Sequence, residues 1–545
     1  MTKPIDLNPD HARIVHEVLA RHLPAGVSVR VFGSRAKWTA KTFSDLDLAV
    51  KGKEQLPHKV MVELTDALEE SDLPFGVDVI DWHAVAPSFQ AVIDRDGVAF
   101  GGKKTGEWQT FKLRNLGRIV TGKTPPTSEP ANFGGEILFV TPSDMTGGRS
   151  IDDTARSLTE IGVKKVGSSY VSEPAVVVSC IGSDMGKAAL VNRRFVSNQQ
   201  INAIIPLPEF DRLFIYYNLS VRKVEIRGKA SGAAQPIMNK SEFGNLELSV
   251  PDLPVQKAIG HVLSTLDDKI ELNRRMNATL EGMAQAIFRD WFVDFGPVRR
   301  KQAMKEQGRA SDPQAVLGGL IQNPARAAEL AALFPDALGE DGLPVGWERL
   351  RLSDIATLRK GSVNPQIQPN TIFEHYSLPA FDKRQEPSMD AGSAIKSNKT
   401  PVAQETILLS KLNPETLRVW LPNDQSDAVQ IASTEFLVFA AKTGASRSLL
   451  FALFRDQTFR ARLQGMVTGT SKSHQRISPP ALMVQDVIAA DQKLFPAFES
   501  LIKPMVERLL ASRAESNSLA ETRDYLLPRL MSGKVRVGDA ARIAA

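Results

Sequence analysis

The sequence predicts an α+β multidomain protein, in which a small N-terminal α/β domain precedes two mixed α/β domains joined by two long antiparallel coiled-coil helices. Three observations predict it. The chain opens on alternating helix and strand patterns, a pattern that begins at Trp108 recurs 239 residues later at Trp347, and both copies end in a long amphipathic stretch. A repeat of this length indicates the architecture of the chain more directly than any single motif does.

Composition and charge are those of a globular protein. The chain has 545 residues, 42% of them hydrophobic and 24% charged, and this length predicts about three or four domains. Apolar runs stay well below the roughly 18 residues that span a bilayer, and the N-terminus lacks the apolar segment of a signal peptide. We therefore expect a cytoplasmic protein with no membrane contact. The single cysteine, Cys180, excludes an internal disulfide and a Cys/His metal set.

The N-terminal domain, predicted for residues 1–104, is organised around the stretch VFGSRAKWTAKTFSDLDLAV (31–50). Asp45 and Asp47 stand two residues apart, so a strand directs both carboxylates to one face, and Asp78 lies in a further strand pattern. Three carboxylates suit Mg²⁺ ions that orient a nucleoside triphosphate for attack at its α-phosphate. Asp81 is an alternative third carboxylate. Gly33 and Ser34 follow a strand, where backbone N–H groups hold phosphates.

These residues resemble the minimal nucleotidyltransferase family, small domains often found as antitoxins. The resemblance covers about residues 8–100 and rests on Gly33-Ser34-Arg35-Ala36, Ser44-Asp45-Leu46-Asp47 and the distal Asp78. It implies catalytic and metal-binding roles for Asp45, Asp47 and Asp78, and nucleotide binding by Gly33, Ser34 and Arg35. Trp38 departs from the pattern, since family members commonly carry Gly there. The alternative is a degenerate domain retained for docking.

The first repeated domain is predicted for residues 105–254 and the second for residues 344–490. Trp108 opens WQTFKLRNLGRIVTGKT and Trp347 opens WERLRLSDIATLRKGSV, and a glycine follows each tryptophan by 14 residues (Gly122 and Gly361). Both segments have the pattern of a strand, a short helical turn and a glycine-bearing loop. Mixed short strands and turns follow in both copies. A linker, residues 296–343, is expected between the first long helix and the second domain, and residues 534–545 form a tail.

Two long helices are predicted at 255–295 and 491–533, because apolar residues recur at alternating steps of three and four. The first helix should run from about 255 to 293, whereas Pro496 and Pro504 predict that the continuous part of the second begins near Pro504. In an antiparallel pair about a pseudo-twofold axis, Asn273 would face Ser516 and Asn277 would face Ser512. The predicted seam residues are Leu266, Ile270, Asn273, Asn277, Leu280, Met505, Leu509, Ser512, Ser516 and Leu519.

Two similar domains held apart by rigid helices suit a ligand with two half-sites, and duplex DNA is the obvious one. Residues 1–105 carry 13 Lys and Arg against 15 Asp and Glu, whereas the other 440 residues carry 54 against 47, a mild basic excess compatible with a polyanion. Cations, hydroxyls and amides in loops are the expected contacts. The DNA-binding candidates are Lys123, Thr124, Arg193, Arg194, Lys229, Ser231, Gln235, Lys360, Ser362, Lys442, Arg447, Thr470, Ser471, Lys472, His474 and Arg476. The segment SNQQIN (197–202) is either base-reading or a strand with internal amide bonds.

From about residue 106 to 540 the chain resembles the specificity subunit of type I restriction–modification systems. The resemblance rests on several motifs in order, among them IGSDMGKAALVNRRFVSNQQ, LPVGWERLRLSDIA, GTSKSHQRIS and LAETRDYLLPRLMSGKVRV. It implies two target-recognition domains that each read half of a gapped DNA site. It also implies a non-catalytic subunit that holds two methylation subunits, which use S-adenosylmethionine on adenine, and restriction subunits that hydrolyse ATP. The alternative is a nucleotidyltransferase, adenylylating a protein, whose DNA-reading part only localises it.

Overall fold

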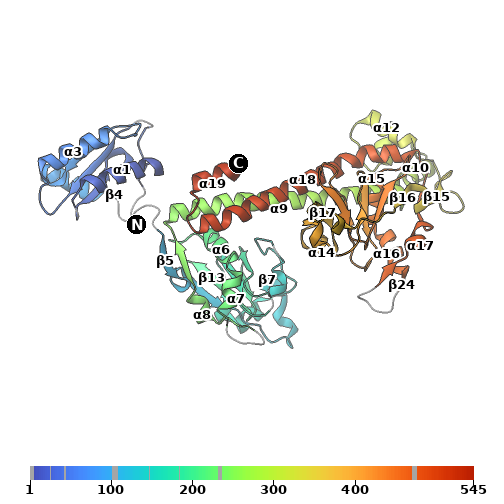
Figure 1. Cartoon of the computed structure of the whole chain (residues 1–545), viewed down its shortest axis with the longest axis horizontal. Helices are drawn as coiled ribbons and strands as arrows, with labels where there is room; N and C mark the ends of the chain where they lie inside the picture. The colour runs from blue at the N-terminus through green and yellow to red at the C-terminus, as the bar shows by residue number, and fades with distance from the viewer. Residues whose placement is uncertain are drawn as a thin grey trace. The chain divides into compact units, whose positions relative to one another are not determined.

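The computed structural model describes residues 5–24, 26–41, 44–100, 108–146, 148–182, 184–230, 236–468 and 475–544. The chain divides into two compact units, with residues 1–263 and 526–543 in unit 1 and residues 264–525 in unit 2. The predicted α+β multidomain class is confirmed, because each domain combines short helices with sheets of its own (Figure 1).

A four-stranded mixed sheet organises the N-terminal domain. The strands lie in the order β3-β2-β1-β4, and β2 and β3 run parallel. Val15, Leu48 and Leu64 are fully buried in its apolar core. The elements are α1 (Pro9–His22), β1 (Ser28–Phe32), α2 (Gly33–Ala36), β2 (Leu46–Lys51), α3 (His58–Glu69), β3 (Val77–Asp81), α4 (Pro87–Asp96) and β4 (Val98–Phe100).

The first repeated domain contains two four-stranded sheets and a two-stranded sheet. Their orders are β11-β10-β13-β6, β8-β7-β12-β9 and β14-β5. The elements are β5 (Gln109–Lys112), β6 (Gly117–Thr121), β7 (Phe133–Val140), β8 (Ser157–Leu158), α5 (Glu160–Lys165), β9 (Tyr170–Val171), β10 (Ala175–Ser179), β11 (Ala188–Val191), β12 (Phe195–Ser197), β13 (Ile201–Pro206), α6 (Arg212–Ser220), α7 (Lys223–Gly228), α8 (Lys240–Gly244) and β14 (Glu247–Val250).

The second repeated domain has sheets of order β16-β23-β20-β21, β18-β17-β22-β19 and β15-β26, with a further β24-β25 hairpin. The elements are β15 (Glu348–Arg351), α13 (Leu352–Ile355), β16 (Ala356–Arg359), β17 (Ile372–Tyr376), α14 (Leu378–Arg384), β18 (Ser388–Ala391), β19 (Thr400–Pro401), β20 (Thr406–Ser410), β21 (Val419–Trp420), β22 (Val429–Ala432), β23 (Phe436–Ala441), α15 (Arg447–Arg455), α16 (Gln457–Gly465), β24 (Val467–Thr468), β25 (Arg476–Ile477), α17 (Pro479–Met483) and β26 (Asp486–Ala490).

The internal repeat predicted from the sequence is confirmed element by element. Strands β5 and β15, β6 and β16, β7 and β17, and β14 and β26 each begin 239 residues apart. The second sheet of each domain also contains one parallel pair, β7 with β12 and β17 with β22. The two domains therefore share a topology as well as a sequence pattern.

Each repeat tryptophan packs on the chain that follows a long helix of the other copy. In unit 2, the Trp347 ring meets the ring of Phe295 edge-on at 5.6 Å. In unit 1, a Cβ on Gly533 would lie 2.9 Å from the indole nitrogen of Trp108, and the φ of Gly533 is +69°. Glycine at 533 thus serves both the backbone conformation and the close approach of the ring.

The two long helices are α9 (Leu253–Phe292), of 40 residues, and α18 (Leu494–Met531), of 38 residues. The first agrees with the prediction of about 255 to 293. The second lies within the predicted range 491–533, but the expectation that its continuous part begins near Pro504 is wrong, since α18 is helical from Leu494 onward. Pro496 lies in the first turn, where backbone N–H groups lack intrahelical partners, and Pro504 is an exposed interior position that forgoes one hydrogen bond.

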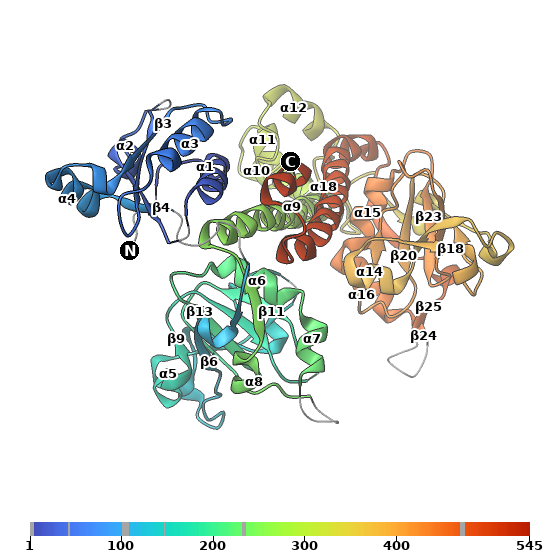
Figure 2. The same cartoon turned by 60° about the vertical axis from the view of Figure 1, so that its left-hand side comes forward.

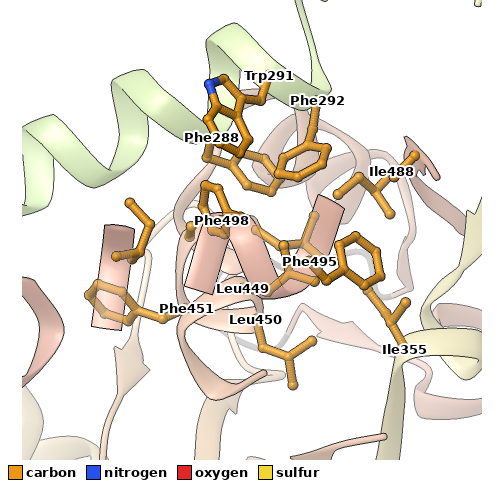
Figure 3. Close-up of a cluster of buried hydrophobic side chains, with 14 of the residues drawn as sticks. Phe288, Trp291, Phe292, Ile355, Leu449, Leu450, Phe451, Ile488, Phe495 and Phe498 are labelled. Carbon is orange, nitrogen blue, oxygen red and sulfur yellow. The ribbon is translucent and has the colours of Figure 1, made fainter. Parts of the chain in front are cut away.

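The segment expected as a linker is part of the folded core of unit 2. It forms α10 (Gly296–Glu306), α11 (Pro313–Val316) and α12 (Pro324–Ala332), and Val298, Val316 and Phe334 are buried in the main cluster. Figure 3 shows another part of this cluster, in which Trp291 and Phe292 of α9 contact the ring of Phe498 of α18 edge-on. A short helix, α19 (Val537–Ala544), ends the described chain.

Candidate nucleotide-binding and DNA-binding sites

Strands β2 and β3 bring three carboxylates together in the N-terminal domain. Asp47 of β2 is in register with Asp78 of β3, and Asp45 directly precedes β2. The pKa of Asp47 is raised by partial burial and by the negative charges of Asp78 and Asp45. Asp45 and Asp78 therefore both lie close enough to Asp47 for their charges to act on it.

Oxygen donors that repel one another have the chemistry of a Mg²⁺ site, because a cation would offset the repulsion that raises the Asp47 pKa. In the positions described here they do not form a ready ligand set. Within the described ranges, no group of three or more His, Cys, Asp or Glu side chains is placed to hold a metal ion. Metal binding by Asp45, Asp47 and Asp78 stays a prediction.

Gly33 leaves room for one of these carboxylates. Its φ is +72°, and a Cβ there would overlap the carboxylate oxygen of Asp47. Glycine is thus required both by the backbone conformation and by the space that Asp47 occupies. Ser34 follows in α2, where its carbonyl accepts from the backbone N–H groups of Lys37 and Thr39. Their predicted contact with phosphates is a proposal considered below.

Arg35 is not available to a nucleotide, and the prediction of that role is wrong. Its side chain is only 7% exposed and stacks over the Phe75 ring at 4.0 Å. Its guanidinium donates to the carbonyls of Ser44, at 2.6 and 3.0 Å, and of Asp6, at 3.0 Å. Burial forces the guanidinium to find protein acceptors. Arg35 therefore holds the backbone immediately before Asp45.

Two further residues of this domain resolve open points. Asp81 is buried, and its oxygens accept from the backbone N–H groups of Leu56 and His83, so it is a structural carboxylate and not a third ligand. Trp38 has a φ of +58°, a left-handed conformation that favours glycine. Its ring is 58% exposed, so this departure from the family pattern does not fill the interior.

The DNA-binding candidates of the first domain are mostly at the surface. Lys123, Arg193, Arg194 and Lys229 are exposed, and the Thr124 hydroxyl donates to Gln199 at 2.7 Å. Arg194 and Lys229 form ion pairs with Glu160 and Glu225 at 3.5 and 2.8 Å. Because exposed ion pairs of this kind contribute little free energy, they can be broken at little cost when another anion binds. The predicted residues Ser231 and Gln235 lie outside the described residues.

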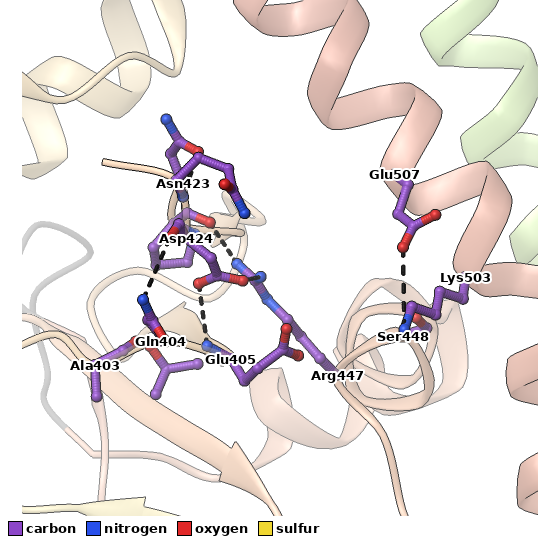
Figure 4. Close-up of polar contacts among 12 residues, drawn as sticks. Ala403, Gln404, Glu405, Asn423, Asp424, Arg447, Ser448, Lys503 and Glu507 are labelled. Atoms are coloured by element: carbon purple, nitrogen blue, oxygen red, sulfur yellow. Dashed lines mark hydrogen bonds and ion pairs between the residues drawn. The ribbon is translucent and has the colours of Figure 1, made fainter. Parts of the chain in front are cut away.

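In the second domain, Lys360, Ser362 and Lys442 are exposed, and Arg476 pairs with Glu435 at 3.1 Å. Four predicted residues, Thr470, Ser471, Lys472 and His474, lie outside the described residues. Arg447 is a wrong prediction, because its side chain is 8% exposed and ion-paired to Asp424, with a hydrogen bond to the Pro422 carbonyl at 2.5 Å. Figure 4 shows Arg447 and the Glu405 backbone converging on the Asp424 carboxylate.

The helices α9 and α18 lie side by side and run antiparallel (Figures 1 and 2). Leu266 and Leu509 are buried in their seam, and Ile270, Leu280, Met505 and Leu519 are half-buried. As the residue number rises along α9, the residue number of the contact partner on α18 falls. The polar contacts that show it are Asp267–Arg523 at 2.7 Å, Asn273–Glu515 at 2.8 Å and Glu281–Arg513 at 2.8 Å.

The expected pairing of Asn273 with Ser516 is corrected. Asn273 is buried and its amide donates to the Ser512 carbonyl at 3.4 Å and to the Glu515 carboxylate at 2.8 Å. The hydroxyls of Ser512 and Ser516 donate to carbonyls of their own helix, so they are not the partners of the amides. No contact tests the pairing of Asn277 with Ser512. A polar layer does meet a polar layer at Asn273.

Sequence reasoning missed a buried ion group on these helices. The Glu281 carboxylate of α9 receives Arg513 of α18 and Arg455 of α15, at 2.8 and 2.5 Å. The pKa of Arg513 is lowered, chiefly by burial. An alternating apolar pattern carries no signal for such a group, because its partners are 174 and 232 residues away.

The fold and these sites define a class: a duplicated-domain scaffold on two antiparallel helices, preceded by a carboxylate-bearing α/β domain. Residues 105–282 match the family described as Type I restriction modification DNA specificity domain. Residues 16–104 match the family described as Polymerase beta, Nucleotidyltransferase. In the part of the chain that the structure describes, helices with the length and apolarity of a membrane span are absent.

Relatives of both parts are known. A type I restriction enzyme specificity subunit of Methanocaldococcus jannaschii is 23% identical over 80% of this chain and 95% of its own length. A probable protein adenylyltransferase, MntA, of Haemophilus influenzae is 38% identical over 16% of this chain and 77% of its own length. The crystal structure of an S subunit from M. genitalium aligns with 79% of this chain and 97% of its own, at 13% identity and a TM-score of 0.47.

Residues 105–282 form a type I restriction modification DNA specificity domain and the chain is similar to type I specificity subunits, whereas the N-terminal domain belongs to the nucleotidyltransferase family.

Proposed function

We propose that this chain reads a two-part, gapped DNA site, one half with each repeated domain. The observation that carries the proposal is the duplication of a whole domain, sheet for sheet, because two equivalent readers suit a ligand with two half-sites. Exposed cations on both copies, among them Lys123 and Lys442, supply phosphate contacts that position the duplex, while amides and hydroxyls contact base edges.

The paired helices determine the number of unread base pairs in this proposal. Their buried seam and their ion pairs make α9 and α18 a stiff element rather than a linker. The chain itself does no chemistry on DNA. Two methylation subunits, with S-adenosylmethionine, modify adenine, and restriction subunits, with ATP, act on unmodified DNA.

The methylated sequence tests DNA reading directly. The chain is expressed with its methylation subunit in a host without adenine methylation, and the genome is sequenced for modified adenine. The expected result is one motif of two short half-sites separated by a gap of fixed length. A continuous motif, or the absence of any motif beside an active methylation subunit, would contradict the proposal.

For the N-terminal domain we propose transfer of a nucleotide, from a nucleoside triphosphate, to a protein partner. The proposal rests on the converging carboxylates and on the similarity to a protein adenylyltransferase. Asp45, Asp47 and Asp78 would hold Mg²⁺, which neutralises charge at the α-phosphate when bound. Gly33 leaves the space that the Asp47 carboxylate occupies, and the N–H groups of Gly33 and Ser34 would hold phosphate oxygens.

The double variant Asp45→Ala, Asp47→Ala tests the transfer. It should lose at least about a hundredfold of Mg²⁺-dependent label transfer from α-labelled ATP to co-purified proteins, and the methylation motif should not change. Asp72→Ala, an exposed carboxylate outside the set, is the control and should keep full transfer. Equal transfer by the double variant and the wild type would refute the assigned site.

A second candidate gives the transferase the main role and leaves the DNA-reading part to localise it. The 38% identity of the first domain to an adenylyltransferase favours this candidate. The duplication favours DNA reading, because localisation does not need two equivalent domains. The double variant Asp45→Ala, Asp47→Ala distinguishes the two candidates. Only the second candidate predicts that the effect of the protein on its host cell is lost in this variant while the methylated motif stays the same.

A further inference from the structure

Two loops of the first repeated domain are joined through their backbones. The loop after β6 and the turn between β12 and β13 are connected by hydrogen bonds from Gly122 N to Ile201 O at 3.0 Å and from Lys123 N to Ser197 O at 2.8 Å. A Cβ on Gly122 would overlap the carbonyl oxygens of Ser197 and Asn198. Glycine is needed here so that the two chains can approach, and the turn is held by main-chain contacts.

The amides of this turn have different roles. The Asn198 and Gln200 side chains bond to each other at 3.0 Å, and the Asn202 oxygen accepts from the Thr121 hydroxyl at 2.6 Å. These three side chains are half-buried or buried, whereas Gln199 is exposed. At three positions of the segment the side-chain amide is therefore hydrogen-bonded within the protein. At the fourth, Gln199, the side chain is exposed to solvent.

Gln199 is exposed but its amide is oriented. Its Oε1 accepts from the Thr124 hydroxyl at 2.7 Å, which fixes one end of the amide and leaves the Nε2 group as the end that Thr124 does not hold. Among the described residues, Nε2 makes no hydrogen bond with the protein. The exposed Lys123 lies next to Thr124 in the chain. A pre-oriented donor beside a cation is the combination that base contact and phosphate contact require.

We propose that Gln199 is a base-reading residue of the first domain and that it recognises a base presenting an acceptor in the major groove. This inference rests on the proposed reading of DNA by the chain. The Nε2 group donates to guanine O6 and N7, adenine N7 or thymine O4, whereas the N4 amino group of cytosine is itself a donor and is rejected. Thr124 is a positioning residue, since it acts by holding the amide.

Gln199→Glu tests the inference, because it keeps the shape of the side chain and replaces the outward donor with an acceptor. At one position of one half-site, the variant should gain cytosine and lose its original base, with methylation of the original motif falling about ten- to hundredfold. The other half-site and the gap should stay the same. Thr124→Val should relax the same position, and Gln199→Ala should relax it as well.

Gln368→Glu is the matched control. Gln368 is exposed in the second domain, and its oxygen also accepts from a threonine hydroxyl, that of Thr371, at 3.4 Å. It should leave the half-site affected by Gln199→Glu as in the wild type. A wild-type gapped motif that is identical in Gln199→Glu, with equal methylation, overturns the role of Gln199 while DNA reading stands. A wild type with no gapped motif overturns DNA reading itself, and the inference with it.

Discussion

The carboxylate of Asp47 lies among negative charges, and its pKa is raised by burial and by Asp78 and Asp45. A raised carboxyl pKa means that the folded domain holds this proton more tightly than the unfolded chain does. Protonation of the group therefore stabilises the fold at a pH below the ordinary Asp value of about 4. This contribution is lost as the pH rises through the folded-state pKa, so the charged cluster opposes folding at neutral pH.

Asp47→Asn should consequently raise the unfolding temperature of the N-terminal domain in the full chain, by about 3 °C at pH 7 and by less at pH 4. Removing one charge removes the repulsion, and at lower pH a larger fraction of the wild-type Asp47 carboxyl is neutral, because its pKa is raised. Mg²⁺ should stabilise the wild type more than the variant. Calorimetry at both pH values measures this, and a variant that is less stable than the wild type at pH 7 would contradict it.

Arg35 and Arg447 show where the reading of single residues fails. In the sequence each is a cation in a loop or at the start of a helix, where a ligand contact is expected. The local pattern is the same as that of exposed candidates such as Lys123. The structure buries both, because their partners, the Ser44 carbonyl and the Asp424 carboxylate, come from elsewhere in the chain. The aspartates of the N-terminal site were predictable, since spacing along a strand determines which face a side chain takes.

At the scale of elements, Glu281 connects three helices of unit 2. Its carboxylate pairs with Arg513 of α18 and Arg455 of α15, and the Gln285 amide donates to the Ala452 carbonyl at 2.9 Å. The Glu281 side chain is 17% exposed. A partly buried carboxylate between two arginines is costly to remove, because the cations are left without a partner.

Glu281→Ala should therefore destabilise unit 2 by about 3 kcal/mol or more in denaturant unfolding. Glu271→Ala is the control on the same helix, since Glu271 also binds two arginines, Arg274 and Arg275, but at the surface. Exposed pairs of this kind contribute less than about 1 kcal/mol. Equal losses in the two variants would show that Glu281 has no special role in joining α15 to the helices.

The long helices were predictable from their period, but not their surroundings. The alternation of three and four located α9 to within two residues at each end. The start of α18 was missed because a proline pattern does not distinguish the first turn, which tolerates Pro496, from a break. The pattern of residues 296–343, basic at first and then short-helical, predicted a linker, and only the three-dimensional core shows that Val298 and Phe334 are buried in it.

At the scale of the whole molecule, the main feature is the internal repeat. An offset of 239 residues predicts two equivalent domains from the sequence alone, and the equal sheet orders confirm them. In the proposed function, the DNA sequence of each half-site does not follow from the offset, because base contacts depend on how single side chains are oriented, as the distant Thr124 orients Gln199.

The most direct measurement of the central claim changes the helices and determines the methylated motif. One heptad is inserted into both α9 and α18 at the layer of Asn273 and Ser512, which lengthens the pair by about 10 Å, or roughly three base pairs of duplex. If the helices set the spacing, the variant methylates the two wild-type half-sites with a longer gap between them. New half-sites, or the wild-type gap in an active and folded variant, would contradict the claim that the two domains recognise the half-sites and that the length of the helices sets the gap between them.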